Sequence, residues 1–489
     1  MADRGGLTYE EMKDAEGLFI PSNVRYMVDS MSNYSTNTFR IETVSSDTAR
    51  AGQIITVNLP SGAALLDLDS FRLHMDVECS GPANPAAPLA DEVYAKLPQN
   101  GAQSLIDRCE VTLNGISISQ ALNQYNTAYN LKQLVKGNVP RNSSVDRAIA
   151  HAEIDPDDPA PAAGSAGVEA ETLVVQDWIG FLGAKEHSTR WFAADLFGAL
   201  SCRLTLAQNS VLVPKVWGVP MGTNLANANQ VANAANMSYT VKNIYFTIQS
   251  ASLNPVYNRM LRERLEVDSY IPLNYKDYYN FSQGGITTGS QSTRYQLSSG
   301  SVDCLYQTQR DSNYKTTGIV PKELGNAAIG SGAFCANAFR FRSYNSWGAN
   351  VNQKLAGNFR HRSSFNNIAM PQYLQDIMGC LANASYVPDK CGMGADGTMI
   401  SSRESFNDGR FVALTTLSHP TQYGVACKSG ANSRGVLSAF TYQTQGQVIP
   451  AASPVNGGTG ESGAIDTFVL VEVTSELRAG LGKDITVLV

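Results

Sequence analysis

Short segments with a two-residue hydrophobic period recur along most of this chain, and they limit its fold more than any other feature. The clearest is RCEVTL at residues 108–113, where polar and apolar residues alternate as in a half-buried strand. Asn114-Gly115 then provides a two-residue turn, and ISI at 116–118 resumes the alternation. Residues 122–134 change to helical spacing. The sequence therefore predicts a β-hairpin followed by a helix.

Further strands are predicted on both sides of one helical stretch. In the first half the segments are TFRIETV, QIITVNLP, FRLHMDVEC and TVKNIYFTIQSA, with the apolar runs LVVQDWIGFLG, WFAADLF, LSCRLTL and SVLVPKVW. In the second half they are YIPLNYKDYYNF, TRYQLSS, AFRFRSYN, RFVALTTLSH, VLSAFTYQ and TFVLVEVTSELRAGLGKDITVLV. Between the halves, NPVYNRMLRERLEV (254–267) has Pro255 at a first helical position and apolar residues at helical spacing. A single helix in a β-rich chain is typical of a connector, so we place a domain boundary there.

Residues 152–170, AEIDPDDPAPAAGSAGVEA, predict a flexible surface insert, because they contain almost no large apolar side chain. Asp157 and Asp158 in this segment could be read as metal ligands. Carboxylates between prolines in such a segment are more often solvated, so no metal site is predicted.

Charge and composition exclude several classes of protein. Only 16% of the residues are charged, against a usual 25% or so, and the net charge is −6. No run of five Lys or Arg occurs, so direct nucleic-acid binding is not expected. No apolar stretch reaches 18 residues, and MADRGGLTYEEMKDAEG lacks the apolar core of a signal peptide. The eight cysteines are scattered without a CxxC pair, which favours buried free thiols in a protein made inside the cell and not secreted.

None of the catalytic or cofactor motifs has the context it needs. GMGADG at Gly392–Gly397 matches GxGxxG, but no strand precedes it and no helix follows. GLGKD at 480–484 lacks the spacing and the Ser/Thr of a phosphate loop. A Ser-His-Asp site built from distant residues stays open, although nothing local supports one. The five histidines are widely spread, at His74, His151, His187, His361 and His419. We therefore predict no catalytic residues, no cofactor and no metal.

Two surface features also have a simple interpretation. Five glycosylation sequons, at Asn33, Asn142, Asn236, Asn280 and Asn383, are most simply chance in a chain rich in Asn and Ser. The aromatic cluster NYKDYYNF at 274–281 could form a carbohydrate platform. Aromatic residues in short β segments are usually core or interface, which is the interpretation we favour.

The order of these segments resembles a known family. SLIDRCEVTLNGISISQALNQYNTAYNLKQL is similar to the stretch "strand, Asn-Gly, strand, QYN-x-x-YN" in the first jelly roll of double jelly-roll major capsid proteins. VKNIYFTIQ, VYNRMLRERLEV and YIPLNYKDYYNF resemble that family's passage to the second roll, and the chain's last strands resemble its ending. The family spans tailless phages, adenoviruses, virophages, polinton-like viruses and large eukaryotic DNA viruses.

The fold class predicted is all-β, with two tandem eight-stranded antiparallel jelly rolls, a short connecting helix and long loops. The predicted division is an N-terminal arm at 1–34, a first roll at 35–250, a connector at 251–267 and a second roll at 268–489. The resemblance implies a homotrimer of pseudo-hexagonal outline that tiles an icosahedral virion shell. It also implies penton and minor capsid proteins as partners, and an internal membrane layer as a further candidate. A surface or secreted β-sandwich adhesin and a carbohydrate-active enzyme remain alternatives.

The N-terminal arm contains one short helical pattern. Thr8 and Glu11 form a capping box, and apolar residues between Leu7 and Phe19 fall on one face. A helix this short is marginal alone, so the arm is either frayed or docked. Its acidic side favours a protein partner, and we predict that it lies at the inner face against a neighbouring subunit or the layer below.

Overall fold

The strands of the first half of the chain form two main sheets in the computed structural model. It describes residues 35–62, 65–81, 93–97, 101–136, 168–183, 190–216, 236–252, 255–315, 337–345, 358–385, 408–409, 411–418, 430–435, 439–449, 451, 462–480 and 484–489. Sheet 1A has the order β1-β12-β4-β8 and sheet 1B the order β3-β10-β6-β7. Their bounds are β1 Ser35–Glu42, β12 Ser238–Ser252, β4 Leu65–Ser80, β8 Val168–Val175, β3 Ile54–Asn58, β10 Leu200–Leu206, β6 Ile106–Leu113 and β7 Ile116–Asn123. Short strands β2 (Ala49–Arg50) and β9 (Trp191–Phe192) join sheet 1A, and β5 (Val93–Lys96) pairs with β11 (Val213–Val216).

The second half repeats this arrangement. Sheet 2A has the order β13-β22-β15-β20, and sheet 2B the order β14-β21-β17-β18. The bounds are β13 Tyr270–Ile286, β22 Ile465–Gly480, β15 Val302–Asp311, β20 Ala413–Thr416, β14 Gln291–Gln296, β21 Ala439–Gln445, β17 Arg360–Phe365 and β18 Ile368–Gln375. Strand β23 (Ile485–Leu488) pairs with β22, and β16 (Phe341–Arg342) pairs with β19 (Asp408–Gly409).

Both halves are jelly rolls with the same strand order. When the eight main strands of each half are numbered along the chain, the sheets read 1-8-3-6 and 2-7-4-5 in both cases. All their pairings are antiparallel. The predicted fold class, two tandem eight-stranded rolls, is therefore confirmed.

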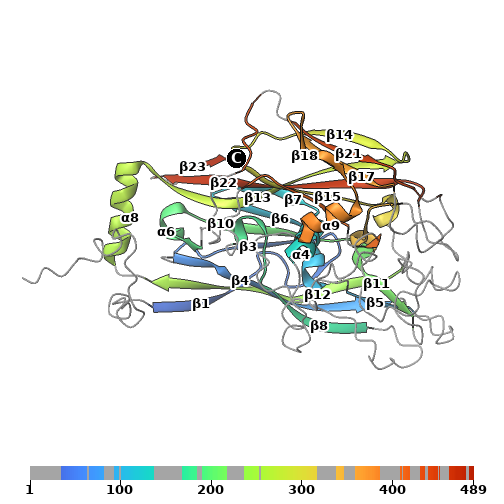
Figure 1. Ribbon diagram of the computed structural model, residues 1–489. Helices are drawn as coiled ribbons and strands as arrows, with labels where there is room; N and C mark the ends of the chain where they lie inside the picture. Colours follow the sequence, from blue (N-terminus) through green and yellow to red (C-terminus); the bar gives the residue numbers. More distant parts are fainter. Residues whose placement is uncertain are drawn as a thin grey trace, which may run out of the picture.

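The four main sheets lie in layers. Figure 1 shows sheet 1A on one outer side, then sheet 1B, sheet 2A and finally sheet 2B on the other outer side. Helix α4 (Tyr125–Lys136) packs against β6 of the first roll, and α9 (Ile377–Ser385) packs against β17, β18 and β20 of the second. One core cluster contains residues of both rolls, whereas a smaller one, including Leu305, Phe440 and Val471, is confined to the second roll. Strand β22 is buried on both faces, with Val469 in the second cluster and Leu470 in the shared one.

The hairpin and the two helices predicted within the described residues are present. Asn114 (φ 50) and Gly115 (φ 83) make the turn between β6 and β7, and α4 follows directly. The connector is α8 (Pro255–Asp268), which spans the gap between the rolls at one end of the molecule (Figure 1). Leu265 on it is buried, and the pairs Arg259–Glu263 and Arg264–Asp268, both at 3.2 Å, lie on its exposed surface. The remaining helical segments are α3 Gly101–Ser104, α6 Ala194–Phe197, η2 Gly180–Leu182, η4 Asn209–Val211, η5 Ser312–Lys315 and η6 Asn337–Phe339.

Some predicted boundaries were wrong. The insert expected at 152–170 ends earlier, because Val168–Ala170 already belong to β8, where Ala170 pairs with Glu78. AFRFRSYN contains only the two-residue strand β16, and the last four residues of WFAADLF form helix α6. Strand β15, VDCLYQTQRD, was not predicted at all. Every residue of β15 is buried, so its polar residues do not mark an outward face.

Candidate functional site

The two rolls meet along β7 and α4 of the first roll and sheet 2A of the second. We call this contact the internal joint. Tyr275 on β13 donates from its hydroxyl to the carbonyl of Ile118 at 2.8 Å, and Ser119 donates to Asp277 at 3.0 Å. Further along β13, the Asn280 side chain donates to the backbone carbonyl of residue 123 at 2.5 Å. The joint thus fixes the edge strand of one roll against the edge strand of the other.

Charged side chains are buried beside this joint. Lys276 Nζ lies 2.5 Å from Asp303 Oδ2 and 3.6 Å from Glu472 Oε1. Lys132 on α4 lies 3.8 Å from Glu472 and also contacts the Tyr278 hydroxyl. Burial opposes the charged form of Lys276, but the two carboxylates outweigh it, and its pKa is raised. The two carboxylates are therefore neutralised by lysines inside the protein, which does not suit the acid and base of a glycosidase.

Asp277 is a buried carboxyl of the joint with a raised pKa. Its side chain is buried, and burial raises the pKa of the carboxyl to about 7, against the opposing effect of hydrogen bonds from Ser119 and Tyr279. The backbone N–H of Tyr278 also donates to Asp277 Oδ1, at 3.0 Å. A carboxyl that titrates near neutral pH therefore lies where the two rolls touch.

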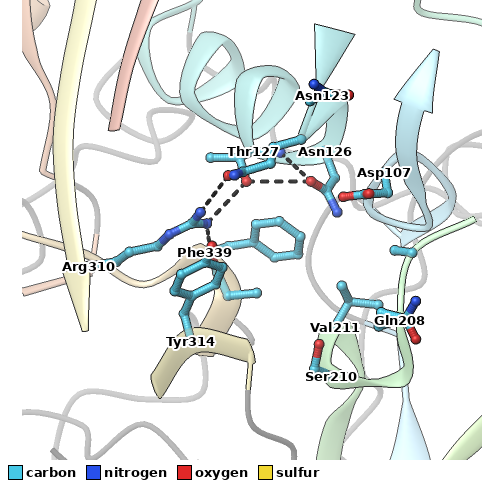
Figure 2. A pocket seen from close by; sticks show the side chains of 13 residues that line it. Asp107, Asn123, Asn126, Thr127, Gln208, Ser210, Val211, Arg310, Tyr314 and Phe339 are labelled. Atoms are coloured by element: carbon cyan, nitrogen blue, oxygen red, sulfur yellow. Dashed lines mark hydrogen bonds between the residues drawn. The ribbon is translucent and has the colours of Figure 1, made fainter. Parts of the chain in front are cut away.

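A cavity of about 420 Å³ opens next to the joint (Figure 2). Asn123, Gln124, Asn126 and Thr127 line it from the first roll, and Arg310 and Tyr314 from the second. Arg310 Nη1 donates to Thr127 Oγ1 at 3.2 Å, and Nη2 donates to Gln124 Oε1 at 2.5 Å. Its guanidinium stacks 3.4 Å from the centroid of the Tyr314 ring, and burial lowers its pKa. Arg310 thus joins the rolls through neutral partners.

A second surface lies on the second roll and exposes large apolar side chains. It consists of β18 and α9, and we call it the β18–α9 face. Ile368 is 59% exposed and Tyr373 64%, and Leu374 and Met378 are exposed as well. The only charged residue between 368 and 385 is Asp376. Sequence reasoning missed this face, because β18 and α9 were not predicted as elements.

The aromatic cluster on β13 belongs to the internal joint and the core. Tyr275 and Tyr278 are fully buried. The core or interface interpretation of 274–281 is confirmed, and a carbohydrate platform there is not. Of the sequons, Asn280 is bonded within the joint, and Asn33 and Asn142 lie outside the described residues. Asn236 lies two residues before the first residue of β12, and Asn383 is an exposed residue of α9.

The other candidate residues do not assemble into a site. His74 stacks on Tyr245 on the outside of sheet 1A, whereas His361 is buried in sheet 2B, where burial lowers its pKa to about 3. Five cysteines are free and buried, as predicted: Cys79, Cys109, Cys202, Cys304 and Cys380. Several predicted features lie outside the described residues: the arm at 1–34, Asp157 and Asp158, His151, His187, His419 and Gly392–Gly397.

Two absences hold for the described part of the chain. No group of three or more His, Cys, Asp or Glu side chains there could hold a metal ion. No helix in the same residues has the length and apolar character needed to cross a bilayer.

Solved structures are similar to the chain over nearly its whole length, although no protein-family model and no curated protein matches the sequence. PBCV-1 VP54, in a crystal structure fitted into a reconstruction of the virophage Sputnik, has a TM-score of 0.55 at 10% identity, covering 94% of this chain and 97% of that chain. A quasi-atomic model of the PBCV-1 virus capsid gives 0.53 at 12% identity, covering 94% and 97%. The Faustovirus major capsid protein gives 0.51 at 10% identity, covering 96% and 93%. At this identity the likeness concerns the fold, and the chain has the double jelly-roll fold found in viral major capsid proteins.

Proposed function

We propose that this protein is the major capsid protein of an icosahedral virus, and that three copies form a pseudo-hexagonal capsomer. The observation that carries this is the pair of rolls with one strand order and a shared core, matched to capsid structures over at least 94% of the chain. Six such rolls in three copies provide the outline of a hexagon from one gene product. The role is structural and not catalytic.

Several finer statements belong to the same proposal. The protein is synthesised in the host cell and located in the virion, where it contacts itself, penton and minor capsid proteins, and in some arrangements an internal membrane layer. Direct nucleic-acid binding is not part of the role, which agrees with the net charge of −6. We keep the division into an arm (1–34), two rolls (35–250 and 268–489) and a connector (251–267).

The adhesin alternative is not favoured, and a mass measurement separates it from the proposal. Light scattering on the purified full chain should give about three times 52.6 kDa, or a far larger shell. Negative-stain images of the three-copy species should show a hexagonal outline. A stable one-copy species at capsid-like concentrations would contradict the proposed function.

The arm provides a second test. Deleting residues 1–20 should leave the three-copy species intact and impair shell formation, because the arm is predicted to contact a neighbour and not to hold the rolls. A truncated chain that loses its three-copy species, or forms shells as well as the full chain, would show that this role of the arm is wrong.

A further inference from the structure

Lys276, Asp303 and Glu472 meet on three neighbouring strands of sheet 2A. Lys276 lies on β13, Glu472 on the central strand β22 and Asp303 on β15. Lys276 Nζ lies 2.5 Å from Asp303 Oδ2 and 3.6 Å from Glu472 Oε1. The Asp303 side chain is 2% exposed, that of Glu472 13% and that of Lys276 15%. An amine, a carboxyl group and a second carboxylate are therefore held together away from bulk water.

A β-bulge directs Asp303 toward the lysine. Residue Cys304 pairs with Glu472, and the register shifts just before it, so Asp303 is an extra residue of β15. Paired residues point to the same face of a sheet and successive residues to opposite faces, so a regular strand would turn Asp303 away from Glu472. Bulges re-aim side chains in this way and are common next to active sites.

Both oxygens of the Asp303 carboxyl group are held by hydroxyl groups. Ser301 Oγ donates to Oδ1 at 2.9 Å, and Thr474 Oγ1 donates to Oδ2 at 2.6 Å. Thr474 Oγ1 also lies 3.0 Å from Lys276 Nζ, which donates to it. Because the carboxyl carbon is bonded to Oδ2, it lies within about 4 Å of Nζ, near the ~3–3.5 Å of a near-attack geometry.

Glu472 presents one oxygen to the lysine. Its other oxygen, Oε2, accepts from the Tyr306 hydroxyl at 3.0 Å and lies 3.8 Å from Lys132 Nζ. These two contacts fix the side chain and leave Oε1 facing Lys276. A carboxylate in this position accepts a proton from the amine and passes it on, and such contacts tighten as the groups react.

We propose that Lys276 and Asp303 form an intramolecular isopeptide bond, with Glu472 as the proton carrier. The bond joins β13, which carries the internal joint, to β15 across β22. It is a covalent modification of the chain by its own residues, and the ion pair described above is the state before the reaction. This inference does not depend on the proposed function.

The reaction balances without a cofactor or an oxidant. Lys276 first gives a proton to Asp303, and the neutral amine attacks Cγ of the protonated carboxyl group. Negative charge then develops on Oδ1, where the Ser301 hydroxyl donates. Glu472 takes a proton from the nitrogen and gives it to Oδ2, which leaves as water. One C–N bond replaces one C–O bond, and Glu472 ends as it began.

Burial favours the amide over the ion pair. A buried ion pair carries the desolvation cost of two charges, whereas an amide has no net charge. Although burial lowers it, the two carboxylates raise the pKa of Lys276, so the neutral pair is the minor form. A minor form suffices, because the reaction occurs once in each chain and little water reaches the site to reverse it. The exposed pair Lys242–Glu78, at 2.7 Å, lacks this environment, so no bond is expected there.

Mass spectrometry of the purified full chain tests the bond. The denatured protein should weigh one water less than the mass calculated for its residues. Trypsin should fail to cleave after Lys276, so that residues 265–294 and 295–310 appear as one branched product. Lys242 is the internal control, and cleavage after it should be complete. A chain with the full calculated mass, or a lost water that maps to other residues, would overturn the inference and leave the proposed function standing.

Three substitutions provide a second readout, with circular dichroism to check that each variant folds. Lys276→Arg keeps the cation but removes the attacking amine, so the variant should have its full mass. Asp303→Asn should still react, with the loss of ammonia in place of water, which an ion pair does not explain. Glu472→Gln should leave most chains without the bond. A folded Lys276→Arg variant that still lacks one water would show that another residue is modified, and a Glu472→Gln variant that reacts as completely as the wild type would remove Glu472 from the reaction.

Discussion

At the scale of single residues, Asp277 links the internal joint to pH. Its pKa is about 7 in the folded chain, against 3.8 as the ordinary value, so the folded state binds the proton more tightly than the unfolded state. The contribution of this group to the free energy of unfolding is complete below about pH 4 and is lost as the pH rises to about 7. A shift of this size corresponds to about 4 kcal/mol at most.

Asp277→Asn should remove this dependence. Relative to wild type, the variant should gain free energy of unfolding between pH 5 and pH 8, measured by chemical denaturation at each pH. Asp76→Asn is the control, because hydrogen bonds from Asn243 and Thr172 lower the pKa of Asp76, and its titration falls below this range. A difference between Asp277→Asn and wild type that does not change with pH would show that Asp277 stays ionised.

The buried ion pairs give a second residue-scale prediction. Lys276→Met leaves Asp303 and Glu472 buried without their nearest cation, and such a loss typically costs about 3–5 kcal/mol. Lys242→Met is the matched control, because Lys242 pairs with Glu78 at 2.7 Å on an exposed surface, where a pair contributes less than about 1 kcal/mol. Urea denaturation measures the free energy of unfolding of both variants. Equal losses of this free energy would mean that burial of the ion pair does not determine its contribution to stability.

At the scale of elements, the sequence predicted the strands that show a two-residue period or a continuous apolar run, and it missed strand β15, whose buried residues are partly polar. In β6, Cys109, Val111 and Leu113 are buried while the residues between them are less so, and the two-residue period is plain. Strand β15 is buried on both faces, so Gln307 and Gln309 obscure any period. These polar residues are satisfied by contacts that no local pattern contains, such as Gln309 with Tyr442 at 3.0 Å.

Local sequence patterns also failed to predict the bulge in β12 and the exposed β18–α9 face. Val241 and Ile244 are both buried although they are three residues apart, because the register shifts between Lys242 and Tyr245 and Asn243 lies at φ 51. The sequence pattern of TVKNIYFTIQSA predicted the strand but not the bulge. The sequence did not predict the β18–α9 face, because neither β18 nor α9 was predicted as an element.

Asn114, in the hairpin between β6 and β7, gives an element-scale prediction. Asn114 also donates to the carbonyl of Phe197 at 2.9 Å, so it ties the hairpin to the start of β10. Asn114→Ala should cost about 1–3 kcal/mol, from two lost hydrogen bonds and the positive φ. Asn114→Gly is the control, because glycine accepts the positive φ and loses only the hydrogen bonds. Thermal unfolding of both variants measures the loss of stability. A larger loss for Asn114→Gly than for Asn114→Ala would contradict this prediction.

At the scale of the whole molecule, the layer order explains why one chain can supply two kinds of contact. Sheets 1B and 2A lie inside the stack, and the outermost layers are 1A and 2B (Figure 1). The internal joint therefore forms within the chain, where no association entropy opposes it. A contact between copies depends on concentration. The exposed β18–α9 face, with Asp376 as its one charged residue, differs in this from the internal joint, which contains buried charges.

That contrast predicts how the three-copy species responds to salt. Only 16% of the residues are charged, and the exposed β18–α9 face includes one charged residue, Asp376, so we expect few ion pairs between copies. Ions at about 1 M reduce the Debye length to about 3 Å and weaken exposed ion pairs, but they do not weaken apolar burial. The mass from light scattering should therefore stay at three copies between about 0.05 M and 1 M NaCl, and sulfate should shift the dissociation to lower protein concentration. Dissociation by NaCl alone would instead mean that charged residues hold the copies together.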